Sequence, residues 1–115
     1  MHKVFKVPFA QIYPLYVKKI ERKGRSVKEL HEVISWLTGF SEAALKKHIK
    51  TESTLKEFFS AAKLNKNAKL ITGTICGVRI EDIEEPLMKK IRYLDKLVDE
   101  LAKGRPMEKI LRKQS

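Results

Sequence analysis

The segment 72–79 carries the residue types that bind a small anion. Gly73 and Gly77 let the backbone approach a ligand closely. The hydroxyl groups of Thr72 and Thr74 can donate hydrogen bonds beside the cation of Arg79. The segment is not a P-loop, because the Lys and Ser/Thr that follow the last glycine of that motif are absent. Small residues with this spacing more often let two elements pack closely, and this is the interpretation that we favour. A small-anion site at Thr72, Gly73, Thr74, Gly77 and Arg79 is the functional alternative.

Basic residues supply the second chemistry, the binding of a polyanion. Lys and Arg side chains on one face are sufficient to contact phosphates. A solvated helix surface has the same composition, and Glu21, Glu29, Glu32 and Glu108 interrupt the basic runs. The candidate nucleic-acid-binding residues are Lys18, Lys19, Arg22, Lys23, Arg25 and Lys28, and a second group of Lys103, Arg105, Lys109, Arg112 and Lys113, with Lys63, Lys66 and Lys69 as a third group.

The chain shows no catalytic or metal-binding motif. Its single cysteine, Cys76, has no neighbouring histidine to activate it, so we expect a small buried apolar residue rather than a nucleophile. His2, His31 and His48 lack the spacing of metal ligands. The sequence therefore predicts no catalytic residue, no metal and no cofactor.

The segment 81–85 contains four carboxylates, whose role can be interpreted in two ways. They can bind a hard cation, but four carboxylates within five residues cannot all converge on one ion. They also precede a predicted helix with Pro86 in its first turn, where negative charge is favourable. We favour this second interpretation.

One long helix is the strongest structural prediction. Apolar residues recur at steps of three and four along Ile80, Ile83, Leu87, Ile91, Leu94, Val98 and Leu101. This spacing places them on one side of an amphipathic helix. With Pro86 at its start and Gly104 beyond its end, the helix is predicted over residues 86–103.

Shorter helices are predicted on both sides of it. Ser26 with Glu29, and Thr54 with Glu57, form capping-box patterns that start helices. Pro14 lies inside an apolar helical pattern, so that helix either kinks there or begins at residue 13. The predicted ranges are 9–23, 26–39, 41–49, a helix from 53 or 54, and a short helix after 106.

The segment 70–78 fits two structures. Ile71, Ile75 and Val78 have helical spacing, whereas the threonines and β-branched residues favour a strand. The two glycines weaken both interpretations. We predict a short helix ending near Gly77, with an irregular or extended segment as the alternative.

The bulk composition indicates a small soluble domain. The chain has 115 residues, 43% hydrophobic and 34% charged, with a net charge of +11. Its length predicts a single domain over 1–115, and the charge favours an acidic partner, nucleic acid or an acidic protein. One cysteine excludes an internal disulfide. Because no signal-peptide pattern and no membrane-spanning apolar run is present, we expect a cytoplasmic protein without membrane association.

Four strings of the sequence resemble a known family of small prokaryotic proteins, Domain of Unknown Function 2200. They are YPLYV at 13–17, WLTGF at 36–40, ITGTICGVR at 71–79, and the run from Pro86 to Gly104. The resemblance extends over nearly the whole chain. It implies a bacterial or archaeal, cytosolic, single-domain and mainly helical protein. It implies no activity, and so no functional residues.

These observations together predict an all-α protein, a small orthogonal helical bundle of five to seven helices around the long helix. Burial of its apolar side chains contributes about 1.5–3 kcal/mol each. The predicted core is Ile12, Tyr16, Ile20, Leu30, Ile34, Trp36, Leu37, Phe58, Phe59, Ile75, Leu87, Ile91, Leu94, Val98 and Leu101.

The function expected from the sequence is a non-catalytic binding module for an acidic partner such as nucleic acid. The alternative is a small-anion-binding or enzymatic protein with a pocket near residues 72–79. A monomer is favoured because the long helix is needed for the core. A homodimer would require apolar residues beyond the main stripe, with Met88 and Leu97 as candidates.

Overall fold

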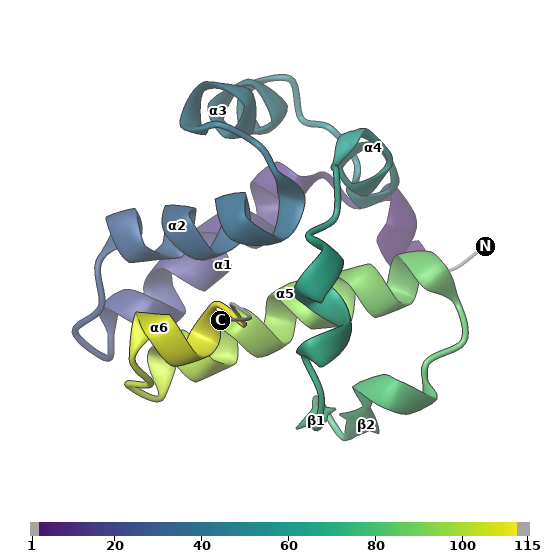
Figure 1. Ribbon diagram of the computed structural model, residues 1–115. Coiled ribbons are helices and arrows are strands. Elements are labelled where there is room, and N and C mark those ends of the chain that lie inside the picture. Colours follow the sequence, from purple (N-terminus) through teal and green to yellow (C-terminus); the bar gives the residue numbers. More distant parts are fainter. Residues whose placement is uncertain (1–2, 113–115) are drawn as a thin grey trace.

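Helix α5 (Pro86–Ala102) is the element around which the others pack. Figure 1 shows it across the middle of the molecule, with α1 (Phe9–Glu21) and α2 (Val27–Thr38) beside one half, α4 (Leu55–Ala61) beside the other, and α6 (Met107–Ile110) at its C-terminal end. The structure is a computed structural model that describes residues 3–112, so the predicted contact residue Lys113 lies outside the described range. Within these residues the remaining α-helix is α3 (Glu42–Lys50).

Short elements connect these helices. Three 3-10 turns are η1 (Lys3–Lys6), η2 (Lys66–Leu70) and η3 (Ile80–Asp82). Strands β1 (Thr74–Ile75) and β2 (Val78–Arg79) form an antiparallel hairpin in which Ile75 faces Val78. The prediction of a small, mainly helical bundle around one long helix is confirmed.

Local capping interactions set the helix boundaries as predicted. The Ser26 side chain accepts from the Glu29 amide, and the Glu29 carboxylate accepts from the Ser26 amide. Thr54 and Glu57 form the same reciprocal pair at the start of α4. Helix α2 ends at Gly39, whose φ of +77° suits glycine, and a Cβ there would lie 3.1 Å from the Lys63 carbonyl oxygen.

One predicted helix start is wrong and another is confirmed. Helix α1 begins at Phe9 and continues through the exposed Pro14, so a start at residue 13 is wrong. Helix α5 begins at Pro86 as predicted, so the apolar stripe that begins at Ile80 extends beyond the N-terminal end of the helix. Ile80 is nevertheless fully buried, in the 3-10 turn η3.

The helix predicted for the segment 70–78 is wrong, and the extended alternative holds. The hairpin turn is made by Cys76 and Gly77, whose φ angles of +53° and +77° match the two positive values of a type I′ turn. Strand alternation exposes Thr74 and buries Ile75, while both residues of β2, Val78 and Arg79, are exposed. Cys76 is exposed at the tip of the turn, so its predicted burial is also wrong.

The buried apolar side chains form one cluster that includes most of the predicted core. Ile12, Trp36 and Leu87 are the exceptions, because each is only half-buried against the cluster. Leu97, predicted at the edge of the α5 stripe, is fully buried. It is therefore part of the core and does not provide a surface for a second copy.

A buried carboxylate ties α6 to α5. Glu100 is only 5% exposed, and both of its oxygens accept hydrogen bonds from Arg112, one of them at 2.7 Å from Nη2. Arg105 Nη1 donates to the same carboxylate at 2.9 Å. The hydrogen bonds from two guanidinium groups thus replace those that the Glu100 carboxylate loses with water on burial.

Replacing Glu100 with alanine is expected to lower the free energy of unfolding by about 3 kcal/mol, because it leaves the poorly exposed Arg112 without its partner. Urea denaturation followed by circular dichroism measures the loss. The matched control is Glu108→Ala on the exposed side of α6, with a change within about 0.5 kcal/mol. Equal effects of the two substitutions would contradict this assignment.

Candidate functional site

A concave basic surface lies between the end of α1 and the end of α5. We call it the basic groove; its volume is about 730 Å³. Five of its side chains are cations and one is a carboxylate. The lining residues are Leu15, Lys18, Lys19, Arg22, Lys23, Asp99, Ala102 and Lys103.

The ends of two helices place these cations. Lys18 and Lys19 belong to the last turn of α1 and Arg22 is its C-cap, while Lys103 is the C-cap of α5. A helix C-terminus carries partial negative charge, which stabilises nearby cations. Because α1 and α5 pack against each other, the two sets of cations meet on one surface.

Asp99 links the two helices whose ends line the basic groove. It lies 3.3 Å from Lys19 Nζ and 3.0 Å from Lys103 Nζ, so one carboxylate bridges α1 and the end of α5. Partial burial alone would raise the pKa of Asp99, but the hydrogen bonds from Lys103 and Lys19 keep that pKa below its ordinary value. The carboxylate is therefore ionised at neutral pH.

Three cations of the groove remain available to a partner. Lys18, Arg22 and Lys23 are exposed and have no ion pair or side-chain hydrogen bond within residues 3–112. Beside them lies Leu15, an apolar side chain that is 59% exposed. The groove thus offers unpaired positive charge next to an apolar contact.

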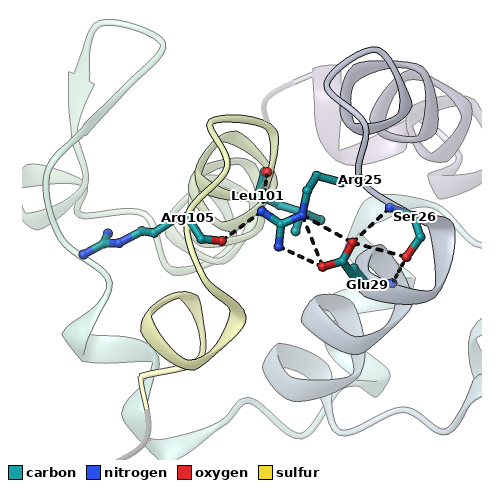
Figure 2. Close-up of polar contacts among 5 residues, drawn as sticks. All are labelled: Arg25, Ser26, Glu29, Leu101 and Arg105. Atoms are coloured by element: carbon teal, nitrogen blue, oxygen red, sulfur yellow. Dashed lines mark hydrogen bonds and ion pairs between the residues drawn. The ribbon is translucent and has the colours of Figure 1, made fainter.

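Arg25, predicted in the same basic group, has a different environment. Its side chain donates to the Leu101 carbonyl at 3.2 Å and to the Arg105 carbonyl at 2.9 Å. It also pairs with Glu29 at 2.8 Å (Figure 2). Arg25 therefore joins the start of α2 to the end of α5, and its guanidinium is occupied within the chain.

The other predicted nucleic-acid-binding residues do not join the basic groove. Arg105 and Arg112 are paired with Glu100. Lys28 lines a separate shallow depression with His31 and Glu42, and Lys109 is exposed on α6. Of the third basic group, Lys63 and Lys66 line another depression beside Trp36, and Lys69 is exposed.

In the segment predicted to bind an anion, a carboxylate of the chain itself occupies a backbone donor. The Gly73 amide donates to Glu81 Oε1 at 2.8 Å, and this hydrogen bond lowers the pKa of Glu81. Arg79 lies 3.6 Å from Glu81 and 4.0 Å from Asp82. Thr72, Thr74 and Gly77 are exposed. An external anion would have to displace Glu81 from the Gly73 amide.

A hydrogen-bonded chain that the sequence did not indicate joins three helices. Tyr13 of α1 contacts Nε2 of His31 on α2, and Nδ1 of that ring lies 2.8 Å from Glu42 of α3. Burial, with the nearby charges of Glu42 and Glu21, raises the pKa of Tyr13, so its phenol is protonated at neutral pH. No local pattern could have found this chain, because its members are brought together only by helix packing.

Neither a metal site nor a membrane span is found in the described part of the chain. No group of three or more His, Cys, Asp or Glu side chains among residues 3–112 is placed to hold a metal ion. The helices over the same residues are too short or too polar to cross a bilayer.

Comparison with known proteins identifies relatives whose own activity is not described. A family model described as "Uncharacterized protein conserved in bacteria (DUF2200)" matches residues 3–112. The crystal structure of an uncharacterized protein, SP1917, superposes with a TM-score of 0.92 at 40% sequence identity. That match covers 100% of this chain and 98% of the other. No curated protein matches the chain.

Two neighbouring arginines should differ sharply in their effect on stability. Arg25→Ala removes donors from two carbonyls and from Glu29, so we expect it to lower the unfolding free energy by about 2 kcal/mol. Arg22→Ala, which removes no such contact, should change it by less than about 0.5 kcal/mol. Parallel urea titrations test the pair, and a large loss in Arg22→Ala would refute the distinction.

Glu29 should make stability depend on acid pH. Its hydrogen bond from Arg25, together with that from the Ser26 amide, lowers its pKa from 4.5 to about 2. The carboxylate therefore stabilises the fold above about pH 4.5, and this contribution is lost as pH falls towards 2. Because the side chain is 31% exposed, we expect Glu29→Gln to cost only about 1 kcal/mol at neutral pH. Unfolding curves of both proteins should converge across that pH range; a constant difference would argue against the assignment.

Proposed function

This chain belongs to the DUF2200 family of uncharacterized bacterial proteins, so we propose its function from the chemistry of its own surface. It is a non-catalytic binding module whose basic groove holds an acidic partner, with nucleic acid as the first candidate. The observation that carries the proposal is the convergence of Lys18, Arg22 and Lys23, unpaired within the described residues, on one concave surface.

The charge of the whole chain supports the same partner. A net charge of +11 on 115 residues attracts polyanions over a distance and speeds their encounter. The groove then provides the local contacts. Its unpaired cations, Lys18 in α1 and Arg22 and Lys23 directly after it, are separate side chains that can neutralise phosphates and release their counterions.

The contacts available in the groove favour recognition of the backbone over recognition of sequence. Lysine and arginine side chains that contact phosphates position a nucleic acid but carry no base-specific information. Lys19 and Lys103, fixed on Asp99, keep the two helix ends in place while the unpaired cations bind. We therefore propose salt-sensitive binding with little sequence preference.

Binding should follow the charge of the groove. We expect the logarithm of affinity for labelled duplex DNA to fall linearly with the logarithm of salt concentration, by about 0.9 per phosphate neutralised. Replacing Lys18, Arg22 and Lys23 together with glutamine should reduce that slope by about 2 to 3 and weaken binding at low salt. Fluorescence anisotropy with duplex DNA and single-stranded RNA at several salt concentrations measures both quantities.

A matched variant distinguishes binding in the groove from attraction by the overall positive charge of the protein. Lys63, Lys66 and Lys69, replaced together with glutamine, remove the same three charges from another surface. This variant should retain most of the slope. Equal losses in the two triple variants would reject the groove as the binding surface, and dissociation constants weaker than about 10⁻⁴ M at physiological salt for both nucleic acids would reject nucleic acid as the partner. In that second case an acidic protein becomes the partner to test.

A further inference from the structure

We propose that a second, separate cavity binds a small monocarboxylate with a compact apolar body. The cavity lies among η1, α1, α4 and α5 and has a volume of about 190 Å³. It shares no lining residue with the basic groove. Figure 1 shows η1 near α4 and the first turns of α5, in the region where these elements meet.

Most of the cavity wall is apolar. Leu55, Phe59, Ile91 and Leu94 form its buried part. The half-buried side chains of Val4, Ile12 and Met88 complete the wall. An apolar body placed here loses water without losing hydrogen bonds, and the flexible Met88 can adapt to its shape.

One end of the cavity is polar. Tyr16 donates from its hydroxyl to Asp95 Oδ1 at 2.6 Å, and Arg92 Nη1 donates to Asp95 Oδ2 at 2.9 Å. Burial and the adjacent Asp95 raise the pKa of Tyr16 well above its ordinary value, so the phenol remains a donor at neutral pH. The polar end is therefore a fixed cluster of one phenol, one carboxylate and one guanidinium.

The cluster selects for a ligand that accepts hydrogen bonds. Each oxygen of Asp95 already accepts one bond, from Tyr16 or from Arg92. Arg92 uses only Nη1 in the contacts of residues 3–112, which leaves its other N–H groups for a ligand. A carboxylate is the acceptor that pairs best with a guanidinium. A ligand cation would instead be repelled by the Arg92 guanidinium, which already neutralises the charge of Asp95.

The volume restricts the ligand to a small one. An apolar cavity of roughly 150 Å³ holds a benzene-sized molecule, whereas drug-sized ligands occupy pockets of about 300 Å³ or more. A cavity of about 190 Å³ thus fits a single ring or a short branched chain with one carboxylate. Benzoate and isovalerate are suitable probes of this class.

The test compares probes of one shape and different charge. Methyl-group NMR of the full chain is recorded during titrations with benzoate, benzyl alcohol and benzylamine. We expect benzoate to shift the methyl signals of Leu55, Met88 and Ile91 and to bind at least tenfold more tightly than benzylamine. Shifts confined to Leu15 and Ala102 of the basic groove, or equal binding of benzylamine, would overturn the proposal.

Two variants assign the contacts. Arg92→Gln should weaken benzoate binding at least tenfold and change benzyl alcohol binding less than twofold, because only the acid needs the guanidinium. Met88→Trp should fill the cavity and weaken both probes. Arg22→Gln in the basic groove is the control and should leave benzoate binding unchanged. Unaltered benzoate binding by Arg92→Gln, or a tenfold loss in Arg22→Gln, would reject this site.

Discussion

The burial of α5 is the constraint on which the rest of the structure depends. Its core-facing side chains, from Ile91 to Leu101, are covered by α1, α2, α4 and α6. A helix enclosed to this extent leaves its polar residues little access to water, so those at its margins need partners. Asp95, Asp99 and Glu100 find them in neighbouring elements: Tyr16 and Lys19 of α1 bind the two aspartates, and Arg112 binds Glu100. The same three carboxylates thereby fix the positions of α1 and the C-terminal segment.

The two proposed binding regions lie along the contact between α1 and α5. The Tyr16–Asp95 hydrogen bond borders the apolar cavity, and the Lys19–Asp99 ion pair borders the basic groove, one helical turn further along α5. Their chemistry differs because the burial differs: the first pair faces apolar side chains, whereas the second is surrounded by exposed cations. The contact between α1 and α5 thus supports one mainly apolar cavity and one positively charged groove.

Local signals in the sequence predicted local structure well. The capping boxes at Ser26 and Thr54 place α2 and α4, because a cap depends only on residues three apart. The hairpin at 74–79 is harder to predict, because Ile71, Ile75 and Val78 also have helical spacing and Cys76 with Gly77 is not among the residue pairs that strongly favour a type I′ turn. The candidate site depends on tertiary packing, because Lys18 and Lys103 meet only through the α1–α5 contact. Arg25 does not join them, because it donates its hydrogen bonds to two carbonyls near the end of α5. Charge counts along the chain carry none of this information.

The exposed position of Cys76 affects how self-association of this protein has to be studied. The thiol is the only one in the chain and is exposed at the tip of a tight turn, where a second molecule can reach it. Air oxidation in a concentrated preparation would join two copies tip to tip through a disulfide, which is a chemical artefact rather than a packed interface. A reducing agent dissolves such a covalent pair, while an association through apolar side chains persists. The same accessible thiol also gives one defined position for a fluorescent or spin label, on the far end of a hairpin that contributes nothing to the basic groove.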